Sequence, residues 1–498
     1  MRSLQELNAL ANLSRYRDVN QFDVLSTQLK DWLQTRQPPT AWEPDPTETV
    51  LAKITDRLSG WVKVHADDIP WAPDPLIATL PESLRVIPEM QTLAALDYSD
   101  QNGHYLREAL WLNQISSGLV AETKDDLAAA TKMFDWIVRN VQLEGPGPLD
   151  EATEAKPPML RRLPWQTVLY GMGTAEERAW TFVCMARQQG LRVVMLALRD
   201  GDANAAPRPW VPALIHEGNF YLFDTQLGLP IPGPGGEGVA TLAQVAADDS
   251  LLRRLDLSEQ RPYPVRAVDL EKVTVWIEAS PAYLSKRMAI LESALSAKDK
   301  LILAGQPTAW TEQIKSLPNV GSVALWPLPQ QTFADAATLA LPGRTAAVQD
   351  FMAMITIPEL WKGRVLHWRR EHETKDTNAV SFYYRAMPTD KELALLPENR
   401  PDLRDYSLRA KQNATYWLGL LQIDRGEPAS AVQYFQRLTL DVWPDGPWTS
   451  GAKYNLARVY ETTGEPAKAA ALYAADVSPQ FHGNRLRGKW LAEKQAMP

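Results

Sequence analysis

Few residues of this 498-residue chain are suited to covalent catalysis. The first candidate is Cys184, which is the only cysteine. One cysteine excludes an intramolecular disulfide and a cysteine-based zinc site. A thiol becomes a nucleophile when a helix N-terminus or an imidazole lowers its pKa. Cys184 instead lies nine residues into a predicted helix that begins at Ala175, and His216 falls at a predicted hairpin turn. We therefore expect Cys184 to be a small buried residue.

The helix that contains this cysteine is marked at both ends. Thr174 is expected to cap it, Glu176 and Glu177 lie in its first turn, and Gly190 ends it. Thr174 has no adjacent base, so it is a cap rather than a nucleophile. Helical spacing predicts one buried face on this helix, formed by Ala175, Ala179, Phe182 and Ala186.

An apolar run and a hairpin follow this helix. The run Leu191–Leu198 has the length of a strand, and two further strands are predicted at Trp210–Ile215 and Phe220–Phe223. Glu217-Gly218-Asn219 supplies the turn between them. Asp224 ends the second strand of the hairpin.

This order of helix, strand and hairpin resembles the core of the transglutaminase-like (papain-like thiol) superfamily, over roughly residues 110–245. In that family Gly-x-Cys opens the helix, a His-x-Trp strand follows, and an Asp ends the next strand. The positions of this chain that match the family pattern are Ala179, Phe182, Arg187, Gly190, Trp210 and Asp224.

At the two positions that would carry the family's chemistry, this chain has other residues than the family's Cys and His. The nucleophile position is Ala175 and the base position is Arg208. Alanine has no atom that can attack, and arginine stays protonated and has no acceptor. The resemblance therefore implies a non-catalytic member, with Ala175, Arg208 and Asp224 as degenerate positions. Asp224 is expected to cap the turn after its strand; alternatively, an Arg208–Asp224 salt bridge replaces the family's His–Asp pair.

Composition limits the partners and the compartment. The net charge is −8 with dispersed basic residues, which argues against nucleic-acid binding. The six histidines show no metal-ligand spacing, and we expect no metal and no cofactor. No apolar run reaches the ~18 residues of a membrane span, and no signal core follows Met1. The expected location is cytoplasmic by default, or the periplasm or cell envelope if the true N-terminus is longer; the oligomeric state stays open.

The C-terminal part contains two copies of one helical spacing. In each copy a small residue is followed by Gly at seven, Ala at twelve and an aromatic residue at sixteen positions. This spacing resembles tetratricopeptide repeats. A weaker copy covers residues 366–386, with Ala379 and Tyr383 at the right offset. The two clear copies are Gly419, Gly426, Ala431 and Phe435, then Ala457, Gly464, Ala469 and Tyr473.

The predicted fold is α+β, a mostly helical chain with a central helix-plus-antiparallel-sheet domain. Four segments are expected. Residues 1–105 form an N-terminal helical region, 106–278 the transglutaminase-like domain, 279–405 a helical connecting region with the weaker repeat, and 406–498 the tetratricopeptide α-hairpin array.

Two classes of function remain. In the first, the chain is a non-catalytic interaction or scaffold protein that binds a protein or peptide through its C-terminal repeats, unless these only support the neighbouring domain. The candidate binding residues there are Trp417, Tyr416, Tyr454 and Arg425. In the second, it is a cysteine-type peptidase or amide transferase with a displaced nucleophile, Cys184 with His216. A structural role in a cell-envelope assembly is a third possibility.

Overall fold

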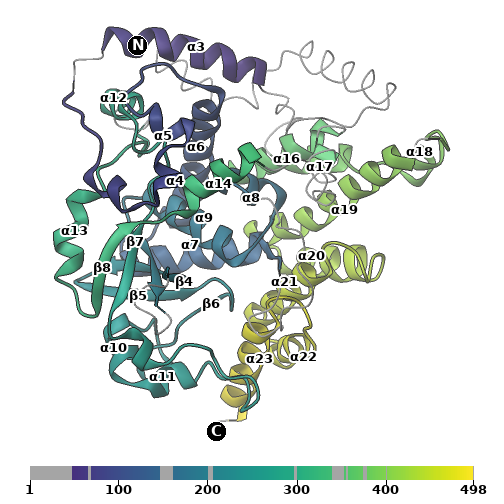
Figure 1. The fold of residues 1–498 in the computed structure, drawn as a ribbon. Helices are drawn as coiled ribbons and strands as arrows, with labels where there is room; N and C mark the ends of the chain where they lie inside the picture. Colours follow the sequence, from purple (N-terminus) through teal and green to yellow (C-terminus); the bar gives the residue numbers. More distant parts are fainter. Residues whose placement is uncertain are drawn as a thin grey trace. The chain divides into compact units, whose positions relative to one another are not determined.

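A computed structural model describes residues 48–65, 69–145, 161–199, 206–295, 300–338, 353–354, 357–373, 378–399 and 401–496. In this part of the chain the protein combines many helices with a small sheet, in agreement with the predicted mixed class (Figure 1). Residues 1–47 of the predicted N-terminal helical region lie outside the described residues.

The chain divides into two compact units. Of the described residues, unit 1 holds 48–54 and 353–473, and unit 2 holds 55–338 and 474–496. Residues up to Thr338 stay with the sheet, and the chain returns to the sheet unit at Ala474.

A six-stranded sheet forms the centre of unit 2. Its strands lie in the order β6-β5-β4-β3-β7-β8, and every pair is antiparallel except β7 with β8. Their bounds are β3 Val193–Leu198, β4 Arg208–His216, β5 Asn219–Asp224, β6 Leu229–Pro230, β7 Val273–Ile277 and β8 Val320–Leu325. Two short parallel strands, β1 (Gln142–Leu143) and β2 (Met172–Gly173), pair separately.

The predicted hairpin is confirmed. β4 and β5 pair with Ala213 opposite Leu222 and His216 opposite Asn219. Glu217 and Gly218 form the turn with φ of 48° and 75°, the left-handed pair that a tight hairpin needs. The run that precedes the hairpin forms β3, which is buried on both faces because it lies in the middle of the sheet.

Helix α9 (Ala175–Arg187) packs against β3 and β4, with three further helices around it. These are α6 (Asp100–Val120), α7 (Asp126–Asn140) and α8 (Pro164–Tyr170). Ala179, Phe182 and Ala186 are buried as predicted, each 0% exposed, but Ala175 is only half-buried. The prediction of a single buried face is wrong, because α9 is buried on all sides from Glu177 to Arg187. Phe182 meets Phe134 of α7 and Phe223 of β5 at ring centroid distances of 5.7 and 5.3 Å, which joins α7, α9 and the sheet.

Shorter elements complete unit 2. The predicted helical connecting region, residues 279–405, also contains a strand, β8. The other helices, the first of which begins in unit 1, are α3 Glu48–Val64, η1 Pro75–Thr79, α4 Glu82–Arg85, α5 Pro88–Gln91, η2 Pro234–Gly236, α10 Leu242–Ala247, α11 Asp249–Arg253, η3 Ala267–Leu270, α12 Lys286–Ala294, α13 Thr308–Lys315, α14 Leu328–Thr338 and α23 Phe481–Ala496.

Helix α23 is an integral part of unit 2. Arg178 of α9 donates to Oε1 of Gln480, the residue before α23, at 2.7 Å, and to the Thr225 carbonyl at 3.1 Å. Leu486 is fully buried in the core that surrounds the sheet. At Gly483 the helix approaches so closely that a Cβ would lie 1.8 Å from the Leu227 carbonyl oxygen.

Unit 1 is built from helical hairpins. Its helices are α16 Pro358–Trp368, α17 Ala379–Arg385, α18 Asp390–Ala394, α19 Pro401–Asp424, α20 Pro428–Val432 with the π-helical segment η6 Gln433–Leu440, α21 Thr449–Thr462 and α22 Pro466–Ala474. Gly426 and Gly464 follow α19 and α21 with φ of 74° and 78°, as helix-ending glycines do.

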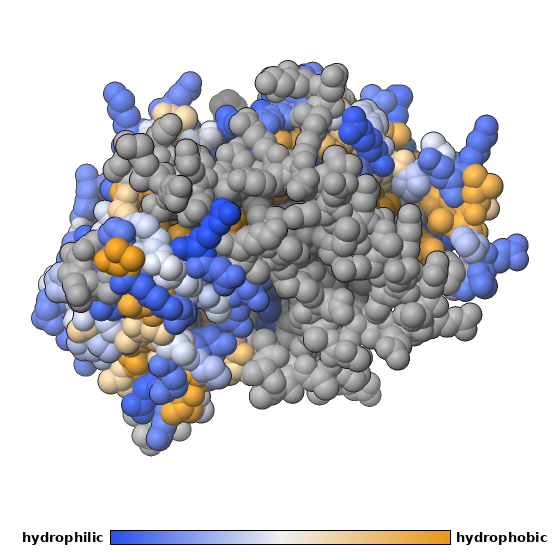
Figure 2. Space-filling view, turned by 90° about the horizontal axis from the view of Figure 1, so that it is seen from above, coloured by the Kyte–Doolittle hydropathy of each residue, from blue (hydrophilic) through white to orange (hydrophobic). Residues whose placement is uncertain are grey.

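On the surface shown in Figure 2, apolar residues lie in small clusters between hydrophilic ones. Exposed large apolar residues include Val64, Val86 and Val268 in unit 2 and Leu395 in unit 1. Among the described helices, none is both long and apolar enough to cross a membrane.

Candidate functional site

Ala175, which the sequence resemblance aligns with a nucleophile position, lies at the start of α9. Thr174 caps this helix as predicted: its side chain accepts from the Glu177 backbone N at 3.2 Å, while Glu177 Oε2 accepts from the Thr174 N at 2.8 Å. This reciprocal pair satisfies two backbone donors of the first turn. Ala175 follows the cap and offers only a methyl group, so the N-terminus of α9 carries no reactive side chain.

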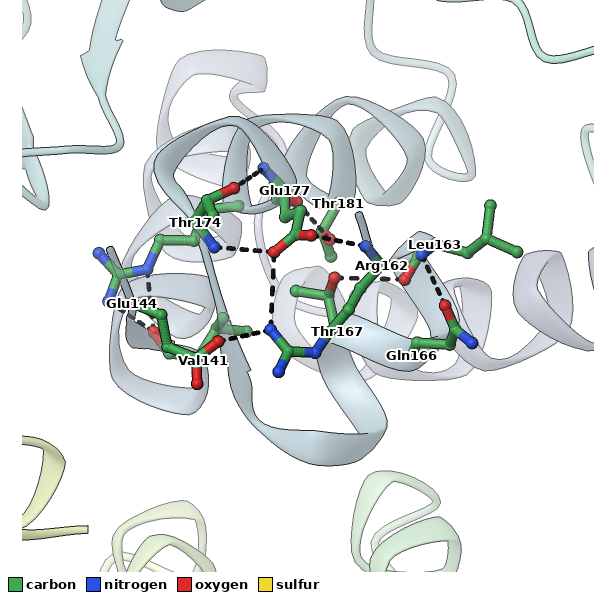
Figure 3. Close-up of polar contacts among 10 residues, drawn as sticks. Val141, Glu144, Arg162, Leu163, Gln166, Thr167, Thr174, Glu177 and Thr181 are labelled. Atoms are coloured by element: carbon green, nitrogen blue, oxygen red, sulfur yellow. Dashed lines mark hydrogen bonds and ion pairs between the residues drawn. The ribbon is translucent and has the colours of Figure 1, made fainter. Parts of the chain in front are cut away.

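A buried charge network surrounds this helix start (Figure 3). Glu177 Oε1 accepts from the Arg162 backbone N at 2.5 Å, and the Arg162 guanidinium lies 2.5 Å from Glu144 Oε2. Burial raises the pKa of the Glu177 carboxyl, and the charge and backbone N–H of Arg162 oppose this. Glu177 is 3% exposed, and its carboxylate hydrogen bonds hold neighbouring backbone in place. The network therefore holds the backbone just before α8 and α9 in place, which is a structural role.

Both side-chain oxygens of Asp224, at the end of β5, accept hydrogen bonds. Its Oδ1 accepts from the backbone N of Gln226 at 2.9 Å and of Leu227 at 2.8 Å, which confirms the predicted capping of the turn. Its Oδ2 accepts from Tyr263 Oη at 2.7 Å, and Tyr263 Oη in turn accepts from Trp210 Nε1 at 2.8 Å. Burial raises the pKa of Asp224, and these hydrogen bonds oppose the shift.

The alternative salt bridge between Arg208 and Asp224 is absent from the described structure. The hydrogen-bond partners of Asp224 are Tyr263 and the turn backbone. The β4–β5 register explains this, because Ala213 opposite Leu222 places the end of β5 near Trp210 and not near the first residue of β4. Tyr263 therefore takes the place that the hypothesis gave to Arg208.

Cys184 lies within α9 and His216 at the end of β4. Cys184 is 7% exposed, and burial raises the pKa of its thiol well above the ordinary value, with Glu278 adding to the rise. His216 lies at the end of β4, where its Nδ1 is 3.5 Å from Asp126 Oδ2. A thiolate needs a positive, accessible neighbourhood, and this thiol has neither access nor an imidazole partner.

Sequence reasoning missed a buried ionisable cluster beside α9. Arg187 forms an ion pair with Glu278, whose Oε1 also accepts from Trp180 Nε1 at 3.1 Å. In the same region Glu108 of α6 accepts from the backbone N of Trp165 at 3.0 Å, and burial raises the pKa of Glu108 to about 8. The signal in the sequence is weak, because nothing local marks Glu278 or Glu108 as interior positions.

The four candidate binding residues of unit 1 are turned inward or paired. Trp417 and Tyr416 are 0% exposed and Tyr454 is 7% exposed. Tyr416 stacks on Trp448 at a centroid distance of 4.3 Å. The three aromatic residues thus fill the interior of unit 1, which leaves them no surface for a partner.

Arg425 keeps a side-chain exposure of 20%, but it is already occupied by two acidic residues. Its guanidinium lies 2.6 Å from Glu373 and 2.7 Å from Glu427. A partner that used Arg425 would have to displace these carboxylates.

Within the described residues, no group of three or more His, Cys, Asp or Glu side chains is arranged to hold a metal ion. Comparison of the chain with protein-family models, curated proteins and solved structures finds no match.

Proposed function

We propose that this chain is a non-catalytic protein-interaction or scaffold protein, in which a degenerate transglutaminase-like domain supports tetratricopeptide-like hairpins. The observation that carries the proposal is the commitment of Asp224 to Tyr263 and the turn backbone. An aspartate that orients a catalytic base would keep an oxygen for that base. Here both carboxylate oxygens accept from groups that cannot act as bases at neutral pH.

The environment of α9 supports the same proposal. The helix that would present a nucleophile begins with Ala175, and the only thiol of the chain is buried further along the helix. The Tyr263 hydroxyl is no substitute, because burial raises its pKa well above the ordinary value and it is held between Trp210 and Asp224.

Close packing between paired helices supports the repeat part of the proposal. A Cβ built on Gly419 of α19 would lie 2.5 Å from the Phe435 ring of η6. A Cβ on Gly363 of α16 would lie 2.8 Å from the Tyr383 ring of α17. A small residue on one helix therefore receives an aromatic ring from the next in both hairpins, which is the packing that repeat arrays use.

The enzyme alternative requires a reactive thiol, and Cys184 is the one available. We expect native full-length protein to give no reaction with a thiol-specific chromogenic reagent, and unfolded protein to give one equivalent. Iodoacetamide, which is smaller, serves as a second reagent so that poor access of a bulky probe is not mistaken for an unreactive thiol. Rapid native labelling by both would revive the cysteine-enzyme hypothesis.

The interaction hypothesis is best tested on the intact chain by lysine cross-linking and mass spectrometry in the source cell. Lys391 and Lys468 are exposed in unit 1, and Lys132 and Lys272 are exposed in unit 2. We expect reproducible intermolecular cross-links at the first pair. Cross-links confined to the second pair would move the interaction to the sheet unit, and their absence from both would contradict a scaffold role.

A further inference from the structure

A chain of buried polar side chains joins three helices of unit 1 around His367, near the end of α16. His367 Nε2 lies 3.1 Å from Asp424 Oδ2 of α19, and His367 Nδ1 lies 3.2 Å from Tyr383 Oη of α17. His367 is 2% exposed and Tyr383 is 0% exposed. Both ring nitrogens therefore hold helices together inside the unit.

The direction of these hydrogen bonds follows from the chemistry of the groups. A carboxylate can only accept, so His367 Nε2 carries the ring hydrogen and Nδ1 accepts from the Tyr383 hydroxyl. The positive charge of Arg364 lowers the pKa of the Tyr383 hydroxyl, against the rise that burial causes. When the imidazole is neutral, the Tyr383 hydroxyl and the His367 Nε2–H each meet an acceptor on the path from Tyr383 through His367 to Asp424.

Every helix packed against His367 contributes a charged or titratable group. Arg364 comes from α16 itself, and His372 follows that helix with its ring centroid 5.8 Å away. Tyr383 comes from α17, and α19 contributes Asp424 and Tyr416, which both act on Arg364. Arg370 and Arg425 act on His372.

Arg364 is the arginine of this cluster that lies in the interior. Arg364 is 0% exposed and lies 4.7 Å above the Trp417 ring and 5.3 Å above the Trp368 ring. An arginine stays charged in such a place. Burial lowers the pKa of His367 below its ordinary value of 6.5; Arg364 and His372 add to this, and Asp424 opposes it.

We propose that His367 is a pH-sensitive contact that holds the α16–α17 hairpin against α19. Proton uptake at its Nδ1 separates the hairpin from α19. The added proton removes the acceptor of the Tyr383 hydroxyl and leaves that buried hydrogen without a partner. It also places an imidazolium beside the Arg364 guanidinium. In the opened chain the imidazole faces water and takes the proton without either penalty.

The direction of the pH dependence follows. Because the pKa of His367 is lower in the closed state than in the open one, the closed state is favoured above about pH 6.5 and loses stability as the pH falls through the lower value. The inference concerns unit 1 alone and holds whether or not a partner binds there.

The test uses full-length protein labelled with ¹³C at histidine Cε1, which gives six signals because the chain has six histidines. Each signal is assigned by its loss in one His→Gln variant. Hydrogen exchange is measured over the same pH range and corrected for intrinsic rates. We expect His367 to titrate below pH 6.5, and protection of α16, α17 and the end of α19 to fall at least about tenfold through that transition.

Two variants distinguish an effect of His367 protonation from general acid sensitivity of the protein. In His367→Gln the side-chain amide can still donate to Asp424 and accept from Tyr383, so protection should persist into the acid range. Asp424→Asn keeps an acceptor but removes the negative charge that favours the imidazolium, so His367 in the closed state should titrate at a still lower pH while opening should not be delayed. His216→Gln, at the surface of unit 2, should retain the wild-type behaviour. Equal loss of protection in His367→Gln, or protonation of His367 without loss of protection, would overturn the proposal.

Discussion

Replacement of Glu108 by glutamine should remove a large part of the pH dependence of unit 2. Glu108 is 7% exposed on α6 and accepts from the backbone N of Trp165 at the start of α8. Burial raises the pKa of its carboxyl from 4.5 to about 8; Glu278 adds to the rise, while the Trp165 N–H, Arg187 and Arg107 oppose it. The group is therefore protonated in the folded chain at neutral pH and ionised in the unfolded chain.

The magnitude follows from the two pKa values. The folded state binds one more proton between pH 4.5 and about 8, so this stabilisation is complete below 4.5 and is lost as the pH rises through the folded value. Each pKa unit corresponds to about 1.4 kcal/mol, which gives a loss of about 5 kcal/mol across this range. Glutamine cannot ionise and can still accept from the Trp165 N–H, so Glu108→Gln should lose this dependence.

Urea denaturation at closely spaced pH values provides the assay, with hydrogen exchange of α6 and α8 reporting on unit 2 because the chain has two units. The two proteins should be similar in stability near pH 4.5 and should diverge as the pH approaches 8, with the variant more stable. Glu271→Gln, at an exposed carboxylate, is the matched control and should follow the wild type. Parallel profiles of Glu108→Gln and wild type over the whole range would refute the argument.

Two further predictions concern unit 2. Tyr263→Phe removes the hydroxyl that donates to Asp224 and should destabilise unit 2 by about 2–4 kcal/mol, since a buried carboxylate oxygen loses its donor; calorimetry that detects no change would contradict this. Gly483→Ala places a methyl group against the Leu227 carbonyl oxygen and should cost at least about 3 kcal/mol through displacement of α23. Ala492→Ser, at an exposed position of the same helix, is the matched control and should leave the unfolding transition unchanged.

The elements that could be predicted from the sequence are those with local signals. Helix α9 has its cap at Thr174 and its ending glycine at Gly190, which adopts a φ of 75°. Strand β8 has no such signal, because Gly321 and Ser322 interrupt its apolar pattern and it exists through pairing with β7, far away in the sequence. Non-local pairing of this kind leaves no trace in local periodicity.

The same distinction applies to the candidate site. Capping by Asp224 follows from its position at a strand end, so it could be predicted. Its second partner, Tyr263, comes from a distant loop and could not be chosen over Arg208 by spacing alone. In unit 1 the aromatic residues Tyr416 and Trp417 have helical spacing, but spacing alone does not tell an interior position from a binding surface.

The path of the chain has a consequence for synthesis. Unit 1 interrupts unit 2, since the chain leaves the sheet unit after Thr338 and returns at Ala474. The ribosome therefore completes the helical hairpins of unit 1 before it releases the segment that contains α23, which brings Gln480 and Leu486 to the sheet unit. Until then the surface that this segment covers stays open on the nascent chain. The helical hairpins, whose contacts are local, can fold first, and the sheet unit closes only after translation has passed them.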